Sequence, residues 1–159
     1  MRLLLCFLLA PGLVRAECSE ETLLSCPVSG SEKQIEMCLE GDQITYSYGR
    51  PGKPELMLSE PLSAGTYMPW NGVGRSMWDV VAFYNDGYTY TVNWSVDRMD
   101  ESLPVQAGVS VDEGGNIVVI LTCAEGTAGP EFGSVLMERM QALGQCWDPT
   151  AQTWTASCN

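Results

Sequence analysis

Apolar and polar residues alternate along much of the chain, which is typical of strands that bury one face in a sheet. The clearest example is residues 88–96, where Tyr88, Tyr90, Val92 and Trp94 alternate with Thr, Asn and Ser. A strongly apolar run at residues 77–84 precedes it, and Asn85-Asp86-Gly87 joins the two with residues suited to a tight turn at positive φ. The pattern predicts a β-hairpin over residues 77–96.

Short segments with the same character occur at regular intervals elsewhere. Residues 22–28 and 34–39 form a predicted hairpin around Ser29-Gly30-Ser31. Further strands are predicted at residues 43–48, 55–59, 105–111 and 117–123. About eight strands at short spacing indicate a mainly β fold, either an antiparallel barrel or a sandwich, over residues 17–125.

The periodicity changes after Cys123. Apolar residues then recur at helical spacing, and Pro130 and Gly144 suit the two ends of a helix. This predicts one C-terminal helix followed by a small closed loop, with residues 126–159 packed on the barrel. The residues expected to face the core are Phe132, Val135, Leu136, Met140 and Leu143.

Residues 1–16 have the features of a secretory signal peptide. Arg2 precedes an apolar run, Pro11-Gly12 breaks it, and Ala16 offers a small residue for cleavage. A lipoprotein cut before Cys18 is the alternative, and it is disfavoured because Glu17 stands where a small residue is needed. We therefore predict a periplasmic or secreted protein, with no later apolar run long enough for a stable membrane span.

The chain is strongly acidic. Its formal charge is −12, and removing Arg2 and Arg15 with the leader leaves 6 basic and 20 acidic residues, or −14. Nucleic acid is excluded as a partner, because binding phosphates needs clustered Lys and Arg. The charge would attract a basic protein or cations, although it also keeps an exported protein soluble.

Six cysteines remain once Cys6 leaves with the leader, and an even number in an exported chain predicts three disulfides. Six cysteines allow 15 pairings, which the sequence alone does not resolve. The favoured set pairs residues placed opposite each other or close in sequence. It consists of Cys26–Cys38 across the first hairpin, Cys146–Cys158 in the C-terminal loop, and Cys18–Cys123 from the remainder.

The chain has no His and no CxxC spacing, which removes the usual zinc ligands and the commonest general base. Asp97, Asp100 and Glu101 do not follow a calcium-loop pattern and are interpreted as a solvated loop. We therefore predict no catalytic residue, no metal and no cofactor, and a protein that is not an enzyme.

Residues 61–79 form the longest predicted connection, and they contain Tyr67, Trp70 and Trp78 among several Gly and Pro residues. One interpretation is a connection whose aromatic side chains fold back onto the core. The other is a presented binding loop, because long ordered loops on rigid sheets often carry function.

The order of features from Cys26 to Cys123 resembles the family of periplasmic C-type lysozyme inhibitors. The features are a first strand with a Cys, a Gly turn and a second strand, then Ser63-Ala64-Gly65-Thr66-Tyr67, a hairpin corner at residues 83–87, and a last strand ending in Cys. Small uncharacterised exported proteobacterial proteins are also similar, since they share the Pro-Trp-Asn-Gly-Val-Gly-Arg loop.

The resemblance implies a small barrel that inserts its Ser-rich loop into a lysozyme cleft. Ser63 would be the inserting residue, with Gly65 and Tyr67 supporting it. The motif is one residue shorter here, and Asn85-Asp86 stands where the family has a Lys in its second loop. Arg75 is the candidate to replace that Lys, and Trp70 is a further candidate binding residue in the same connection.

We therefore expect an exported non-enzymatic binding module, an inhibitor of lysozyme-like glycoside hydrolases acting through residues 61–79 on a basic partner. The alternative is a structural or envelope-associated protein without an enzyme target. The sequence leaves the oligomeric state open.

Overall fold

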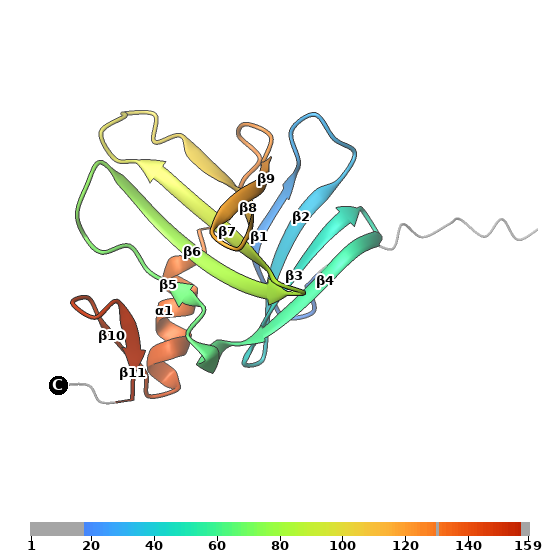
Figure 1. The fold of residues 1–159 in the computed structure, drawn as a ribbon. Coiled ribbons are helices and arrows are strands. Elements are labelled where there is room, and N and C mark those ends of the chain that lie inside the picture. Colours follow the sequence, from blue (N-terminus) through green and yellow to red (C-terminus); the bar gives the residue numbers. More distant parts are fainter. Residues whose placement is uncertain (1–17, 130, 157–159) are drawn as a thin grey trace, which may run out of the picture.

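The computed structural model describes residues 18–129 and 131–156, so the predicted signal peptide lies outside the described residues. The described chain is mainly β, with two large antiparallel sheets, and an α-helix and a two-stranded hairpin near the C-terminus (Figure 1). This confirms the fold class predicted from the alternation of apolar and polar residues.

The first sheet is a four-stranded meander in sequence order, in which each strand pairs antiparallel with the next. Its inward face is almost wholly apolar. Its strands are β1 (Glu21–Pro27), β2 (Gln34–Glu40), β3 (Gln43–Arg50) and β4 (Lys53–Pro61).

The second sheet has five strands, also in sequence order, and a short 3-10 helix, η1 (Leu62–Ala64), leads into it. The turn between its second and third strands has Asp86 at φ 48° and Gly87 at φ 85°, as the sequence predicted. Its strands are β5 (Tyr67–Met68), β6 (Ser76–Asn85), β7 (Tyr88–Asp97), β8 (Val105–Glu113) and β9 (Asn116–Thr122).

The core lies between the two sheets, where alternate residues of their strands are buried. In β7, for example, Val92, Trp94 and Val96 point into it, while the residues between them are partly exposed. The sheets touch at one end through the bridge between Val28 and Cys123, but they do not close into a barrel. Of the two architectures predicted, the sandwich is the one observed.

The C-terminal segment packs against the same core. The helix α1 (Gly133–Ala142) is followed by a small hairpin of β10 (Cys146–Asp148) and β11 (Thr153–Thr155). Phe132, Leu136 and Met140 are fully buried, as predicted, and Val135 packs partly against the core. Leu143 is 38% exposed, because α1 ends before it and the chain turns away at Gly144, so its prediction as a core residue was wrong. Pro130 lies outside the described residues.

Two disulfides join residues other than those predicted. Cys18 pairs with Cys38, and Cys26 pairs with Cys123, so the predicted Cys26–Cys38 and Cys18–Cys123 bridges were wrong. The reason is the register of the first hairpin, which places Cys26 opposite Ile35 and Cys38 opposite Thr22. The predicted Cys146–Cys158 bridge includes Cys158, which lies outside the described residues.

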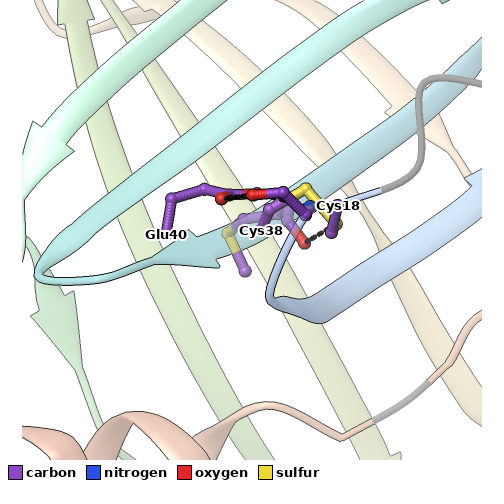
Figure 2. The surroundings of a disulfide bond; sticks show 5 residues. Cys18, Cys38 and Glu40 are labelled. Carbon is purple, nitrogen blue, oxygen red and sulfur yellow. Dashed lines mark hydrogen bonds between the residues drawn. A yellow bond between two sulfur atoms is a disulfide. The ribbon is translucent and has the colours of Figure 1, made fainter.

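The Cys18–Cys38 disulfide ties the start of the described chain to β2 (Figure 2). Glu40, on the same strand, accepts hydrogen bonds from the backbone N–H and the hydroxyl of Ser19, which lowers the pKa of its carboxyl group. Cys18 is the residue that a lipoprotein anchor would modify, and here its sulfur is already used in the disulfide. Two disulfides are consistent with an oxidising, extracytoplasmic compartment. Within residues 18–129 and 131–156, no helix is long and apolar enough to cross a membrane.

Candidate binding loop

The connection between β4 and β6 starts with a tight turn that exposes Ser63. Leu62 is fully buried beneath it, and Gly65 closes the 3-10 turn in the left-handed region at φ 72°. Its backbone N–H donates to the carbonyl oxygen of Leu62 at 3.2 Å. A residue with a Cβ would be strained at this φ, so Gly65 is needed for the turn that presents Ser63.

Tyr67 anchors the loop in the interior. It pairs with the buried Val81 of β6, and its own side chain is 1% exposed. Its hydroxyl lies 2.8 Å from Oδ1 of Asp79 and 3.0 Å from the carbonyl oxygen of Gly133, the first residue of α1. Tyr67 was predicted to support binding from the loop. Its side chain offers no contact surface and instead fixes the loop to the helix.

Asp79 is a partly buried carboxyl group at the centre of this anchor. Burial raises the pKa of Asp79 to about 6, and the nearby charge of Glu131 acts in the same direction. Hydrogen bonds from the Tyr67 hydroxyl and the Trp70 backbone N–H act in the opposite direction. Gly133 is needed here, because a Cβ at this position would overlap the Asp79 carboxyl group. The acid therefore joins β6, the loop and the start of α1.

The C-terminal hairpin supports the base of the loop. The indole N–H of Trp154 donates to the carbonyl oxygen of Tyr67 at 2.7 Å, and the two rings stack with centroids 5.8 Å apart. Trp147 packs against Trp154 at 5.3 Å. Residues almost ninety positions apart in sequence thus hold the loop, which makes it an ordered part of the fold.

The second half of the loop, residues 70–75, forms an arm fixed by contacts of its own. Trp70 is half-buried, its indole N–H donates to the carbonyl oxygen of Val73 at 2.9 Å, and the guanidinium of Arg98 lies 5.3 Å from the ring centroid. Trp78 is half-buried on β6. Trp70 and Trp78 are therefore neither fully buried nor fully exposed, unlike the buried Tyr67.

Arg75 is exposed but paired. Its Nε and Nη2 both lie 2.7 Å from Oδ2 of Asp97, and its carbonyl oxygen accepts from the backbone N–H of Arg98 at 3.2 Å. The side chain holds the arm against the end of β7. Since Asp97 already neutralises it, Arg75 is poorly placed to act as the free cation that was expected to replace the family's Lys.

The structure also separates the two halves of the predicted site. Thr66 lies beside Ala82, whose backbone N–H donates to it at 3.0 Å, whereas Arg75 immediately precedes β6. Seven residues of extended strand span roughly 24 Å. Figure 1 shows the connection after β5 extending along β6, away from η1. Ser63 and Gly65 therefore form one exposed surface, and Trp70 and Arg75 form another.

A hollow of about 300 Å³ lies beside the first of these surfaces, and Gly65, Thr66, Met68 and Trp147 are among the residues that line it. Two buried polar atoms that line this region, Oγ1 of Thr66 and Nε1 of Trp147, have no hydrogen-bond partner in the described structure. Within residues 18–129 and 131–156, no group of three or more acidic or Cys side chains is arranged to hold a metal ion.

Sequence reasoning missed the residues that hold the loop in place, namely Asp79, Gly133 and Trp154. One signal was available, because Asp79 is the only charged residue in the otherwise apolar run of residues 77–84. A carboxyl group in such a run needs hydrogen-bond donors nearby. Its donors, however, come from distant or irregular segments that the sequence pattern does not place.

The fold and the loop define an antiparallel β-sandwich that presents an ordered surface turn. Comparison with models of protein families, with curated proteins and with solved structures finds no match for this chain.

Proposed function

We propose that the protein is an exported, non-enzymatic binding module that inhibits a lysozyme-like glycoside hydrolase through the turn at Ser63–Gly65. The observation that carries the proposal is the exposure of Ser63 between two buried anchors, Leu62 and Tyr67. A turn held this firmly loses little conformational entropy when it binds.

The chemistry of the turn suits an acidic active-site cleft. A Ser hydroxyl is small, and it donates a hydrogen bond that a catalytic carboxylate accepts. The formal charge of −12 complements a basic enzyme and would speed the encounter between the two proteins. The lysozyme-like target follows from the resemblance of residues 63–67 to the inhibitor motif, and the anchoring of this turn supports it.

The pairing of Arg75 with Asp97 changes the role expected of the second half of the loop. We assign Arg75 to positioning the arm, while Trp70 and the exposed residues 71–74 are available to a partner beyond the cleft. The Ser63 turn is thus the primary contact, and the arm is secondary.

The test is an inhibition and binding assay with the exported, disulfide-bonded protein against C-type and other lysozymes at low salt. We expect inhibition at micromolar protein that weakens as salt rises, because the attraction is electrostatic. Ser63→Ala should weaken binding about tenfold, a loss of about 1.4 kcal/mol, without lowering the thermal unfolding temperature.

Ser31→Ala is the matched control, since Ser31 is an exposed turn serine at the β1–β2 connection. Asp100→Ala, on the loop after β7, should likewise leave inhibition unchanged. The absence of binding to every lysozyme class at micromolar protein would reject the proposal and favour the structural or envelope-associated alternative.

A further inference from the structure

The strand β9 exposes an unusual run of apolar side chains. Its sequence is Asn-Ile-Val-Val-Ile-Leu-Thr, and residues 116–124 include no charged residue in a chain that has 28 of them. The exposed fractions are 63% for Ile117, 49% for Val118, 43% for Val119 and 68% for Ile120. Such a patch on a soluble protein marks an interaction site.

The main chain of β9 is open on one side. β9 is the last strand of its sheet and pairs only with β8. On the other side, β1 reaches only its C-terminal end, where the backbone N–H of Ser29 donates to Thr122 at 2.8 Å and that of Ala124 donates to Pro27 at 2.8 Å. In the part of the chain that the structure describes, residues 117–121 therefore have no second strand beside them.

Exposed edge strands are usually protected by Lys, Pro or a bulge. Here neither Lys nor Pro occurs between Asn116 and Ala124. The register with β8 shifts between Val111 and Asp112, so Val118 forms a bulge near the start of the strand. From Val119 onward the pairing is regular, and the edge there can accept another strand.

A groove of about 500 Å³ lies next to this edge, between the two sheets. Val118, Val119 and Leu121 form one wall, and no charged residue lines it. The rest of the lining consists of tyrosines and aliphatic residues of β3, β4, β7 and β8, namely Tyr46, Tyr48, Leu56, Tyr88, Tyr90 and Val111. A strand added to β9 could place apolar side chains over this groove.

We propose that β9 is the interface through which two copies of this chain pair, antiparallel and about a twofold axis. An added strand can form hydrogen bonds with the unpaired backbone N–H and C=O groups along the edge, whereas a helix or a small molecule cannot pair with a whole row of them. Antiparallel self-pairing sets Ile and Val opposite Ile and Val, so the strand is complementary to itself.

Charge supports the same occupant. Two chains of formal charge −12 repel each other, and an interface must therefore avoid placing carboxylates face to face. The uncharged stretch of residues 116–124 meets this requirement, and the side chains of residues 117–121 offer neither charge nor hydrogen-bonding groups to select a foreign partner. The remaining repulsion predicts a dimer that becomes tighter as salt rises.

This interface is independent of the proposed function, because β9 and β5 lie at opposite edges of the five-stranded sheet (Figure 1). An experiment can therefore reject one of the two proposals without rejecting the other. A substitution in β9 should leave the Ser63 turn intact.

The test is sedimentation velocity on the exported, disulfide-bonded protein from micromolar to near-millimolar concentration, at low and high salt. We expect a reversible monomer–dimer equilibrium that shifts toward the dimer with concentration and with salt. Ile120→Lys should raise the dissociation constant about tenfold or more. Ile117→Lys provides a second variant on the same strand, in case the first alters folding.

Met57→Lys is the matched control, because Met57 is 70% exposed on β4, the edge strand of the other sheet. It should leave the dissociation constant unchanged. A monomer at every concentration and salt would overturn the proposal. So would a dimer that survives both β9 substitutions, or one that Met57→Lys weakens equally.

Discussion

The two edges of the five-stranded sheet are built in opposite ways. At the β5 edge, a strand of only two residues is covered by α1 and the C-terminal hairpin, which hold Tyr67 and Asp79 in a network of hydrogen bonds. At the β9 edge, the apolar side chains of residues 117–120 are exposed, and in the described chain no second strand lies beside most of β9.

This difference shows how one sheet serves two purposes. The covered β5 edge gives the loop a rigid base, and the exposed Ser63 turn projects from that base. The open β9 edge keeps its backbone groups available to a second chain. Long-range contacts within the chain thus determine where partners can bind. The β5 edge is covered by other segments of the same chain, whereas the β9 edge remains open to a second chain.

The largest effect on stability is expected from removing the disulfide at Cys123, which directly follows the C-terminal end of β9. Replacing Cys26 and Cys123 together by Ser removes a disulfide between residues 97 positions apart, and should lower the free energy of unfolding by about 4 kcal/mol. Denaturant unfolding monitored by tryptophan fluorescence measures the loss.

Replacing Cys18 and Cys38 by Ser is the comparison for this variant. That disulfide spans 20 positions, so its removal should cost about 3 kcal/mol. A larger loss for the Cys18–Cys38 pair would show that the length of the closed loop does not determine how much each disulfide stabilises the fold.

The covered edge is tested by Gly133→Ala. The added Cβ would overlap the Asp79 carboxyl group and should destabilise the protein by about 1–3 kcal/mol through overpacking. The melting temperature and a denaturant curve measure this effect. Gly129→Ala is the control, since a Cβ there meets no atom within 4 Å. Equal effects of the two substitutions would mean that the contact between α1 and Asp79 does not secure this edge.

The smallest effect is a pH dependence that originates at Asp79. Its pKa is about 6 in the folded protein and 3.8 when unperturbed, so between these values the folded state binds more protons. The stability that protonated Asp79 contributes is therefore complete below pH 3.8 and is lost as pH rises through about 6.

Asp79→Asn should reduce this slope between pH 4 and 6.5, while retaining a side-chain oxygen that can accept from Tyr67 and Trp70. The quantity to measure is the difference in unfolding free energy between wild type and variant across this range, because other carboxyl groups contribute equally to both. A difference that does not change with pH would show that Asp79 titrates normally.

The strands were predictable because their signal is local. In β7, alternation and the Asn-Asp-Gly turn fixed both the strand and its hairpin, and burial of Val92, Trp94 and Val96 follows from that alternation. The C-terminal helix was predicted in the same way, although Leu143 was assigned to the core one residue beyond the helix end.

The contacts between distant segments were not predictable. The Cys26–Cys123 disulfide depends on how the ends of two different sheets meet, and the position of Cys38 depends on the hairpin register. The inward orientation of Tyr67 likewise follows from its pairing with the buried Val81. The sequence motif at residues 63–67 identified the exposed Ser63 turn, but it did not reveal that Tyr67 anchors that turn.

Hydrogen exchange of the backbone amides, measured at several protein concentrations, tests the contrast between the two edges most directly. We predict that amides along β6, including that of Ala82, which donates to Thr66, are protected at every concentration, whereas the open side of β9 from Val119 to Leu121 gains protection only as concentration rises. Protection of β9 that is strong and independent of concentration would contradict the account, as would rapid exchange at Ala82.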